Sequence, residues 1–448
     1  MKYDAIIIGG NPAGASAASA FKQTYKDKSV LVIRKEKDAL IPCGIPYAIG
    51  SLPSVDANIK AVDGLQKKGV EFAYDEVVSV NSEEKTLSTA AGETHSYSKL
   101  VFATGSNPFV PPIPGADLDG IITIQKNTEY IRSIREDLRS AKNLVVIGAG
   151  FIGVEVCDEL VKFSEKVTLI EAMDSILPLA FDKDMSDHIE EKLSSHGVSI
   201  IKSAMVSRIG GSDGKVSHIE LSDGSTLPAD KVILSIGYRP NTALAGKTGL
   251  LLGSTGGIWT DEYMRTSVED IFAVGDCVEH KDYFSGKPSR LMLASTGAAE
   301  ARVAGFNLFN LKIVRHCKGS IAIFSSSLND ISMGAAGLTE KQAEKEGFDI
   351  ILAHSEGMDR HPGKITDASK VMIKGIFSKE GGVLLGAQII GGKSTGEMIN
   401  ILGLAIQKSM TASELAIMQY GTQPLLTSGP GVYPIVLCAM NALEKLIK

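Results

Sequence analysis

The stretch NLVVIGAGFIGVEVCDEL, residues 143–160, decides the fold of this chain. An apolar run at 144–147 has the pattern of a strand buried on both faces of a parallel sheet, and a helical pattern follows it. Between the two lie three glycines at the spacing G-x-G-x-x-G, namely Gly148, Gly150 and Gly153. This arrangement predicts a strand–turn–helix unit whose helix N-terminus receives the pyrophosphate of a dinucleotide.

The next predicted strand, 167–170, ends in Glu171, which lies 23 positions after Gly148. A carboxylate there accepts hydrogen bonds from both ribose hydroxyls of NAD and repels the 2′-phosphate of NADP. No arginine follows it, because Ala172 and Met173 come next. The sequence therefore predicts NADH, rather than NADPH, as the nucleotide.

A less regular copy of the fingerprint opens the sequence. An apolar run at 5–8 leads into GGNPAGASAASAF, residues 9–21, where Gly9 and Gly14 fit the first and last glycine positions. Asn11 takes the middle position, at which glycine is the rule. A second dinucleotide unit is expected here.

The acidic residue expected after the second strand of this unit, predicted at 29–33, is missing. Arg34 and another basic residue come first, and Glu36 follows. Two contacts with the adenosine half of the ligand therefore stay open. Either Glu36 binds the ribose, or Arg34 covers the adenine.

Both units close with a similar element. KLVFATGSNPFVPPIPG, residues 99–115, ends a strand at Ala103-Thr104-Gly105, and KVILSIG, residues 231–237, ends one at Gly237. The stretch TSVEDIFAVGDC, residues 266–277, then ends a strand at Gly275-Asp276. The Asp276 carboxylate is either an ordinary turn residue or an acceptor for a flavin ribityl chain. Residues 291–306 predict a small-residue helix against the cofactor.

One cysteine stands in a distinctive setting, IRKEKDALIPCGIPYAIG, residues 33–50. Pro42 precedes Cys43, and Gly44 and Pro46 follow it, which predicts Cys43 at the N-terminus of a short helix. The helix dipole and unpaired amides there stabilise a thiolate. A buried structural cysteine is the alternative. Position 48 is alanine, so the segment holds no second thiol.

Bulk properties exclude several classes of function. The chain has 448 residues, 44% hydrophobic and 22% charged, with a net charge of −6 and a pI near 5.8. These values argue against nucleic acid or an anionic membrane as a partner. Five scattered cysteines without a CxxC pair predict no metal site and no disulfide framework. No signal peptide and no apolar run of about 18 residues are seen, so a cytoplasmic enzyme is expected.

The pattern changes from about residue 325. VMIKGIF, GGVLLGAQIIGG and NILGLAIQKSMTASELAIM read as strands followed by amphipathic helices, without a nucleotide motif. An α+β domain is expected, whose apolar surface meets a second subunit.

These motifs together resemble the FAD-dependent pyridine nucleotide–disulfide oxidoreductases with a single redox cysteine. That group includes coenzyme A disulfide reductases, NADH oxidases, NADH peroxidases and NADH-dependent persulfide reductases. The resemblance runs from IIIGG to LAIQKSMTASEL. It implies an α/β fold with two Rossmann-like three-layer domains and an α+β C-terminal dimerisation domain, in a homodimer. The implied domains are 1–115 with 246–324 for FAD, 116–245 for NAD, and 325–448 for dimerisation.

The resemblance also implies a cofactor site. Phe151 matches an aromatic residue that gates the nicotinamide pocket, and Glu155 either faces that pocket or is a solvated helix carboxylate. The positions expected to contact FAD or NADH are Gly9, Asn11, Pro12, Ala13, Gly14, Arg34, Glu36, Pro42, Ala103, Thr104, Gly105, Gly148, Gly150, Phe151, Ile152, Gly153, Glu155, Glu171, Gly237, Gly275, Asp276, Ala294 and Gly297.

The chain departs from the family pattern in the C-terminal domain. Arg360-His361, followed by Pro362-Gly363, stands where coenzyme A disulfide reductases have a tyrosine pair before a Pro-Gly. The stretch MQYGTQPLLTSGPGVYP offers no histidine and no acid, which leaves Tyr420 and Tyr433 as proton donors or as half-buried interface residues. The predicted catalytic set is Cys43, His361, Tyr420 and Tyr433.

The interpretation is NADH-dependent reduction of a small sulfur–sulfur substrate, with electrons passing through FAD to Cys43. Coenzyme A is a candidate substrate, and Lys22 and Lys26 are either contacts for its phosphates or solvated lysines. One alternative is an NADH oxidase or peroxidase in which Cys43 cycles through sulfenic acid. Another is an electron-transfer reductase of a small redox protein, with Cys43 incidental.

Overall fold

The computed structural model describes residues 1–315 and 318–448. The chain forms two compact units, and each is made of several segments of the sequence. The first holds Met1–Pro111, Thr123–Asp137 and Ile236–Ser320, and the second holds Pro112–Ile122, Leu138–Ser235 and Ile321–Lys448. Each unit is described by itself.

The first unit is built on a seven-stranded sheet in the order β3-β2-β1-β6-β5-β4, with β17 paired to β6. Its strands are β1 (Lys2–Ile8), β2 (Val30–Arg34), β3 (Val70–Tyr74), β4 (Val77–Asn81), β5 (Thr86–Thr89), β6 (Thr94–Phe102) and β17 (Ile271–Ala273). Strands β3, β2, β1, β6 and β17 are parallel, and Ile8 lies between Ile33 and Phe102 in the register. The continuous apolar runs of β1 and β2 are therefore buried on both faces, as predicted.

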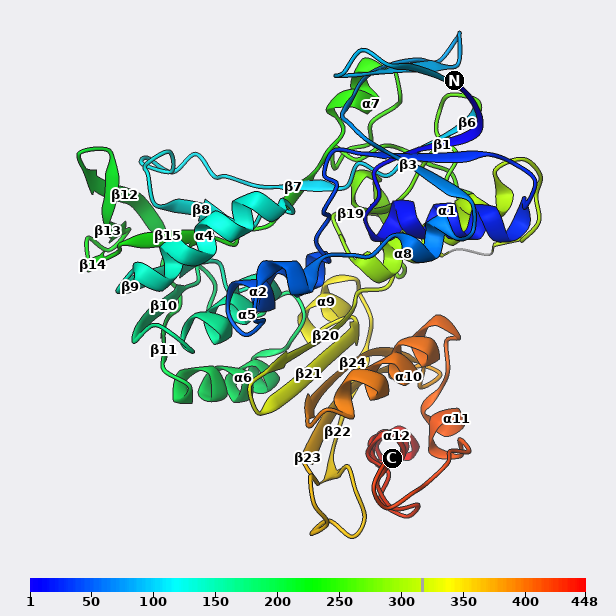
Figure 1. The fold of residues 1–448 in the computed structure, drawn as a ribbon. Coiled ribbons are helices and arrows are strands. Elements are labelled where there is room, and N and C mark those ends of the chain that lie inside the picture. Colours follow the sequence, from blue (N-terminus) through cyan, green and yellow to red (C-terminus); the bar gives the residue numbers. More distant parts are fainter. Residues whose placement is uncertain (316–317) are drawn as a thin grey trace. The chain divides into compact units, whose positions relative to one another are not determined.

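Two helices pack together on this sheet, α1 (Pro12–Thr24) and α8 (Ala294–Asn307), as Figure 1 shows. Their small residues allow the close approach, since a Cβ at Gly305 would lie 2.7 Å from the carbonyl oxygen of Ala17. The remaining elements of the unit are η1 (Pro42–Gly44), α2 (Ile45–Ile49), η2 (Val55–Asn58), α3 (Asp63–Gln66), β7 (Ser106–Pro108), β16 (Tyr238–Pro240), α7 (Ala243–Lys247), η3 (Gly275–Cys277), β18 (His280–Lys281) and β19 (Pro288–Ser289).

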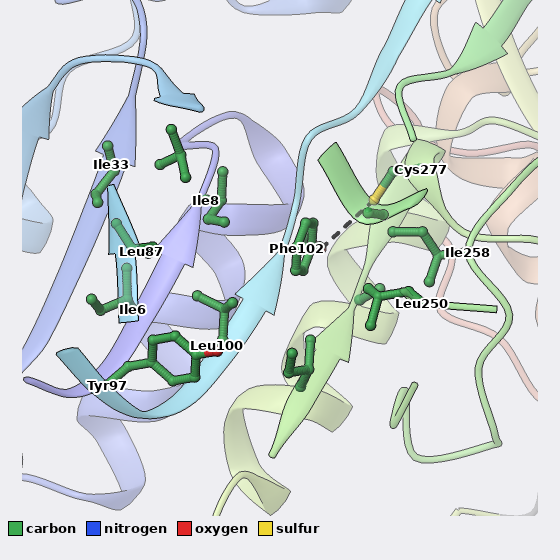
Figure 2. Close-up of a cluster of buried hydrophobic side chains, with 14 of the residues drawn as sticks. Ile6, Ile8, Ile33, Leu87, Tyr97, Leu100, Phe102, Leu250, Ile258 and Cys277 are labelled. Carbon is green, nitrogen blue, oxygen red and sulfur yellow. Dashed lines mark hydrogen bonds between the residues drawn. The ribbon is translucent and has the colours of Figure 1, made fainter. Parts of the chain in front are cut away.

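One hydrophobic cluster of the first unit lies between the sheet and the helices α1 and α8, and a second lies on the other face of the sheet. Figure 2 shows Ile6, Ile8 and Leu100 pointing into one cluster with residues from 250–277. Cys277 belongs to it, is fully buried, and donates its thiol to the carbonyl oxygens of Val274 and Phe102. Full burial of each large aliphatic side chain stabilises the fold by about 1.5–3 kcal/mol.

The second unit contains a five-stranded sheet in the order β11-β10-β9-β15-β8. Its strands are β8 (Ile121–Thr123), β9 (Asn143–Ile147), β10 (Lys166–Ile170), β11 (Val198–Ile201) and β15 (Lys231–Leu234). The second unit also holds α5 (Phe151–Leu160), α6 (Lys183–Ser195) and the three-stranded sheet of β12 (Val206–Ser212), β13 (Lys215–Leu221) and β14 (Thr226–Pro228), whereas α4 (Thr128–Ser140) begins in the first unit and ends in the second. The strand expected at 231–237 is shorter in the structure, since β15 ends at Leu234, and Gly237 after it has a φ of 104°.

The C-terminal part of the second unit is an antiparallel sheet in the order β20-β21-β24-β23-β22. Its elements are β20 (Ile323–Leu328), β21 (Ile331–Gly337), α9 (Glu340–Lys345), β22 (Ile350–Met358), β23 (Lys370–Ser378), β24 (Leu384–Gly391), α10 (Thr395–Gln407), α11 (Ala412–Ala416) and α12 (Pro434–Ile447). Thr339 and Thr411 start α9 and α11 with capping boxes. The predicted fold class, two Rossmann-like domains and an α+β C-terminal domain, is confirmed. Among the described residues, no helix has the length and apolarity of a membrane span.

Candidate active site

Cys43 lies in the tight turn η1, directly before the short helix α2, as predicted. It is exposed, whereas the other three cysteines of the described chain, Cys157, Cys277 and Cys438, are buried. Burial raises the pKa of the Cys438 thiol to about 12 and raises the pKa values of the Cys157 and Cys277 thiols as well. Cys317 lies outside the described residues. Of the described thiols, Cys43 is therefore the one that a solute can reach.

The backbone of the Cys43 turn is held by Asn58. This side chain is buried, and its amide donates to the Ile41 carbonyl oxygen at 3.0 Å, while the Ile41 amide donates to the Asn58 carbonyl oxygen at 3.0 Å. A Cβ at position 44 would overlap the Asn58 carboxamide, so a larger residue after the cysteine would displace the side chain that holds the turn. The turn is thus fixed from both the backbone and the side chain of Asn58.

The segment that carries Cys43 is also braced by the start of α4. The Thr128 hydroxyl donates to the Asp38 carbonyl oxygen, and the Arg135 guanidinium donates to the Leu52 carbonyl oxygen at 2.7 Å. Arg132 forms an ion pair with Asp56. Three contacts from one helix therefore span both ends of the cysteine segment.

The first fingerprint brings strand, helix and turn into closest contact. The Gly9 amide donates to the Ile33 carbonyl oxygen at 2.8 Å, and Gly9 has a φ of 104°, which favours glycine. A Cβ at Gly14 would overlap the Gly9 carbonyl oxygen. Asn11 is the N-cap residue of α1, whose first turn holds Pro12 and Ala13, and its Oδ1 is buried without a hydrogen-bond partner in the described chain.

Arg34 occupies in the first unit the place that Glu171 occupies in the second. Gly9 bonds to Ile33 as Gly148 bonds to Ile170, and the residue after each carbonyl is Arg34 or Glu171. Arg34 is buried, lies over the rings of Phe72 and Tyr74, and donates through Nη2 to the Lys37 carbonyl oxygen. Its Nε and Nη1 have no partner among the described residues. Glu36 is half-buried two positions on.

Asp276 lies in η3, where Gly275 and Gly297 of α8 pack closely enough that a Cβ at Gly297 would lie 2.9 Å from the Gly275 Cα. Ala294 begins α8 one turn earlier. The Asp276 carboxylate accepts from the Ser106 hydroxyl at 2.8 Å and from the Lys126 ammonium at 3.1 Å. Ser106 directly follows the predicted Ala103-Thr104-Gly105, but its contact with Asp276 was not predicted, and no motif marks Lys126.

The two closing elements, which the sequence showed as parallel copies, pair with each other through β7 and β16. The Thr104 hydroxyl donates to the Asn241 carbonyl oxygen at 2.6 Å, and the Asn241 amide donates to the Gly105 carbonyl oxygen at 2.9 Å. No described atom lies within 4 Å of where a Cβ would stand at Gly105 or Gly237. Both glycines therefore border space that the described chain leaves open, and Gly105 lies two positions after Ala103 at the end of β6.

The second fingerprint has the geometry of a pyrophosphate site. The Gly148 amide donates to the Ile170 carbonyl oxygen at 2.8 Å, and a Cβ at Gly153 would overlap the Gly148 carbonyl oxygen. No described atom lies within 4 Å of where a Cβ would stand at Gly150, and α5 begins with Phe151 and Ile152. The Glu171 carboxylate accepts from the Ala149 and Met173 amides at 2.8 and 2.9 Å, which fixes it beside this turn.

Phe151 and Glu155 lie one turn apart on α5, and both contact strand β20. The Phe151 ring stacks on Phe324 with centroids 4.8 Å apart, and the Ser326 hydroxyl donates to Glu155 Oε1 at 2.6 Å. Burial raises the pKa of Glu155 to about 6, the Ser326 hydrogen bond lowers it, and the charge of Glu159 raises it. Neither Phe324 nor Ser326 was predicted.

The predicted C-terminal residues gather around one loop. His361 Nδ1 lies 2.8 Å from the Thr427 carbonyl oxygen, so the proton is on Nδ1. Tyr420 and Tyr433 flank the same loop with stacked rings 4.4 Å apart. The Tyr420 hydroxyl donates to the Pro430 carbonyl oxygen. Burial raises the pKa of Tyr433, and the charge of Tyr420 raises it further.

A groove of about 340 Å³ lies between α1 and the segment after η2. Its lining residues are Ala15, Ser16, Ser19, Lys60, Ala61, Gly64, Leu65 and Lys68. Burial and the charge of Arg34 lower the pKa of Lys60. Of the lysines predicted to meet a substrate or to be solvated, Lys22 donates to the carbonyl oxygens of Lys26 and Lys28 in the turn after α1, and the Lys26 side chain is exposed.

Comparison with protein families decides the identity of the fold. Residues 3–301 match the pyridine nucleotide-disulphide oxidoreductase family, and residues 323–431 match its dimerisation domain. The chain belongs to this family.

Individual members of the family match nearly the whole chain. The NAD(P)H sulfur oxidoreductase (CoA-dependent) of Pyrococcus abyssi is 34% identical and covers 87% of this chain and 88% of its own length. The NAD-dependent persulfide reductase of A. fulgidus is 31% identical with a TM-score of 0.90, over 99% of this chain and 83% of that chain. The water-forming NADH oxidase of Lactobacillus brevis, bound to NADH, is 28% identical with a TM-score of 0.88, over 100% and 99%.

The predicted enzyme class is thereby confirmed: this oxidoreductase depends on FAD and oxidises a pyridine nucleotide. Its residues fit both groups. The buried acceptor of Asn11 and the two buried donors of Arg34, all without protein partners in the described chain, suit the polar adenosine and pyrophosphate groups of FAD. The open turn at Gly150 and the fixed Glu171 carboxylate suit NADH.

Proposed function

We propose that this oxidoreductase reduces a small disulfide or persulfide with NADH, and that Cys43 is the group that attacks the sulfur–sulfur bond. The observation that carries the proposal is the exposed Cys43 in a turn clamped by Asn58, while position 48 holds a buried alanine. A thiol that is reachable and fixed suits attack on a substrate sulfur. FAD, when bound, supplies the two-electron link between nicotinamide and thiol.

The reaction balances with one protein thiol. The Cys43 thiolate attacks one sulfur of RS–SR, forms a mixed disulfide and releases RS⁻, which takes a proton. Two electrons from NADH then break the mixed disulfide and restore the Cys43 thiolate with release of the second RSH. The sum is NADH, H⁺ and RSSR giving NAD⁺ and two RSH. With a persulfide the products are RSH and hydrogen sulfide.

The proposed assembly is a homodimer through residues 325–448, with FAD held by 1–115 and 246–324 and NAD by 116–245. The match of 323–431 to a dimerisation domain supports it. So does the apolar surface exposed in this region, namely Ile401, Leu404, Ile417, Leu425, Leu426, Val432 and Met440. Such a surface is typical of a subunit interface. His361, Tyr420 and Tyr433 are the proposed proton donors on this domain.

Coenzyme A is the proposed carrier of the sulfur substrate. The groove at α1 holds two lysines, Lys60 and Lys68, in the same unit as Cys43. The Lys60 amide donates to the Ala39 carbonyl oxygen at 2.8 Å, so the groove is joined to the segment of Cys43. Two ammonium groups suit the phosphates of a nucleotide-bearing thiol. The Pyrococcus relative is described as CoA-dependent, which supports the same ligand.

Replacing Lys60 and Lys68 together by alanine is expected to raise KM for coenzyme A disulfide by about tenfold, because two ion pairs of up to about 1 kcal/mol each are lost. The KM for cystine, which has no phosphate, is expected to stay unchanged. Lys67→Ala is the matched control, since Lys67 is exposed and does not line the groove. Equal effects on both substrates would count against a phosphate-binding groove.

The proposed reaction is tested by offering each acceptor alone. Anaerobic NADH oxidation is measured with coenzyme A disulfide and with coenzyme A persulfide, and aerobic oxidation with oxygen and with hydrogen peroxide. We expect the highest kcat/KM with a sulfur acceptor. The oxidase of Lactobacillus brevis supports the second candidate function, in which Cys43 cycles through sulfenic acid. Faster turnover with oxygen or peroxide would select that function instead.

We expect kcat/KM to be at least about tenfold higher for NADH than for NADPH, because Glu171 repels a 2′-phosphate. The engineered NADPH-using form of the Lactobacillus oxidase supports the assignment. It carries replacements at a glycine, at an aspartate with the alanine and methionine after it, and at a proline, and this chain has Gly153, Glu171, Ala172, Met173 and Pro178 at the same intervals.

Glu171→Ala combined with Ala172→Arg is therefore expected to reverse the preference for NADH. Asp174→Asn is the control, because Asp174 is a neighbouring exposed carboxylate whose loss leaves Glu171 in place. Steady-state kinetics with both nucleotides measure the change. A wild-type enzyme that uses NADPH as well as NADH would contradict the role of Glu171.

A further inference from the structure

Strand β20 presents two side chains to the first turns of helix α5. Phe324 and Ser326 are two positions apart and so point to the same side of the strand, and Phe151 and Glu155 are four positions apart on one face of the helix. The stacked rings lie 4.8 Å apart, and the Ser326 hydroxyl donates to Glu155 at 2.6 Å. Two independent contacts therefore join the same pair of elements.

This face of α5 borders the dinucleotide site. The helix starts at the fingerprint glycines, with Gly150 as its N-cap and open space beside it. A dinucleotide whose pyrophosphate lies at this N-terminus extends one of its halves past the side chains of the first turns. Glu171 stands at the end of β10, where it suits the adenosine ribose, which leaves Phe151 and Glu155 to the nicotinamide half.

We propose that Ser326 is a positioning residue for the nicotinamide half of NADH, because its hydroxyl holds the Glu155 carboxylate as an acceptor for the nicotinamide carboxamide. The ring pair of Phe151 and Phe324 fixes β20 against α5, so that the hydroxyl meets the carboxylate at a constant distance. The C-terminal domain thereby takes part in nucleotide binding in addition to its proposed role in dimerisation. The inference rests on the proposed binding of NAD at α5.

The Ser326 hydroxyl influences the protonation of Glu155 near neutral pH, because the surroundings of Glu155 raise its pKa. Burial raises the pKa of Glu155 to about 6, and the Ser326 hydrogen bond is the contribution that opposes it. Glu159, one turn further along α5, acts in the same direction as burial and is itself paired with Lys162 at 2.6 Å. Removing the hydroxyl raises the pKa of Glu155 further, so the protonated form, which offers the carboxamide a weaker acceptor, persists to higher pH.

The test is the pH dependence of NAD⁺ binding to the oxidised holoenzyme. The Kd is measured by calorimetry from about pH 5.5 to about pH 9. In the wild type, affinity is expected to fall as the pH drops through about 6. In Ser326→Ala, the midpoint is expected to move up by about one pH unit, the shift that follows from losing one hydrogen bond to a charged group. At the alkaline end the two Kd values are expected to coincide.

Three variants separate positioning from a general structural effect. Ser326→Thr keeps a hydroxyl and is expected to restore the wild-type midpoint, and Ser325→Ala, an exposed neighbour on the same strand, is expected to leave it unchanged. Glu155→Gln is expected to remove this pH dependence. Coincident wild-type and Ser326→Ala profiles would overturn the inference alone, whereas a wild type that does not bind NAD⁺, or binding that Glu171→Ala leaves intact, would overturn the proposed site itself.

Discussion

Cys43→Ser is expected to lower turnover with coenzyme A disulfide or persulfide by at least about 10³-fold, the order expected when a covalent nucleophile is lost. Serine keeps nearly the same size in the η1 turn, so Asn58 and Gly44 still hold the backbone. The hydroxyl is not ionised near neutral pH and does not form a mixed disulfide. FAD is expected to stay bound, because its other proposed contacts, such as Asn11, Arg34 and Asp276, are unchanged and serine keeps the size of the side chain beside Pro42.

Three measurements check this result. Anaerobic NADH is expected still to bleach the flavin absorbance, since that half-reaction needs no thiol, while sulfur-dependent NADH oxidation stops. Oxygen then becomes the outlet, with slow formation of hydrogen peroxide. The long-wavelength absorbance of a thiolate beside a flavin, expected in the two-electron-reduced wild type, is expected to be missing in the variant.

The matched control is Cys438→Ser. Cys438 is buried in α12 and donates to the Ala353 carbonyl oxygen, a bond that serine can also make, so this enzyme is expected to keep its sulfur-dependent turnover. Retention of sulfur turnover by Cys43→Ser would make Cys43 a bystander. An electron-transfer reductase of a small redox protein would then be the better interpretation of the fold.

The parts of the fold that could be predicted are those written in local sequence. The buried strands β1 and β9, the glycine turns after them and the exposed turn of Cys43 each depend on neighbouring residues, and all were found. Arg34 was also found at the position where the other unit has Glu171, but its contacts with Phe72, Tyr74 and the Lys37 carbonyl oxygen were not predicted.

Contacts between distant segments carried no such signal. Ser326 lies among three consecutive serines on β20, and nothing in that run marks the one that meets Glu155 across 171 positions. Lys126 donates to Asp276 across 150 positions, and no motif surrounds Lys126. Lys22, predicted either to contact a coenzyme A phosphate or to be solvated, instead donates to the carbonyl oxygens of Lys26 and Lys28, which are only a few positions away in the sequence.

The other large effect concerns stability rather than catalysis. Lys374 of β23 is buried, and its ammonium lies 3.1 Å from Asp182, 2.9 Å from Asp184 and 3.0 Å from Glu340. Asp182 is itself buried and forms hydrogen bonds with Gln388 on the adjacent strand. This network joins the start of α6, in the segment proposed to bind NAD, to the C-terminal sheet.

The contribution of the Lys374 network to stability is expected to be constant across neutral pH. Burial opposes the charge of Lys374, but the hydrogen bond and charge of Asp184 with the charge of Asp182 outweigh it, so the pKa of Lys374 is raised above 10.5. Its contribution to stability is present below that value and is lost as the pH rises through the folded pKa. Burial likewise opposes the charge of Asp184, and Lys374 outweighs it and lowers the pKa below 3.8. That contribution is present above about pH 4 and is lost as the pH falls through the folded pKa.

Lys374→Met is expected to cost about 3–5 kcal/mol in the free energy of unfolding, because removing one partner leaves the buried Asp182 carboxylate without its cation. Hydrogen–deuterium exchange of the β23 amides and of residues 180–190 measures the loss locally, which suits a chain whose units need not unfold together.

Lys379→Met is the matched control, since Lys379 pairs with Asp349 at 3.4 Å with both side chains mostly exposed, and such pairs contribute at most about 1 kcal/mol. Combining Lys374→Met with Asp182→Asn removes the orphaned charge and is expected to recover part of the loss. Equal, small losses in Lys374→Met and Lys379→Met would show that water reaches Asp182 and that the network is not desolvated.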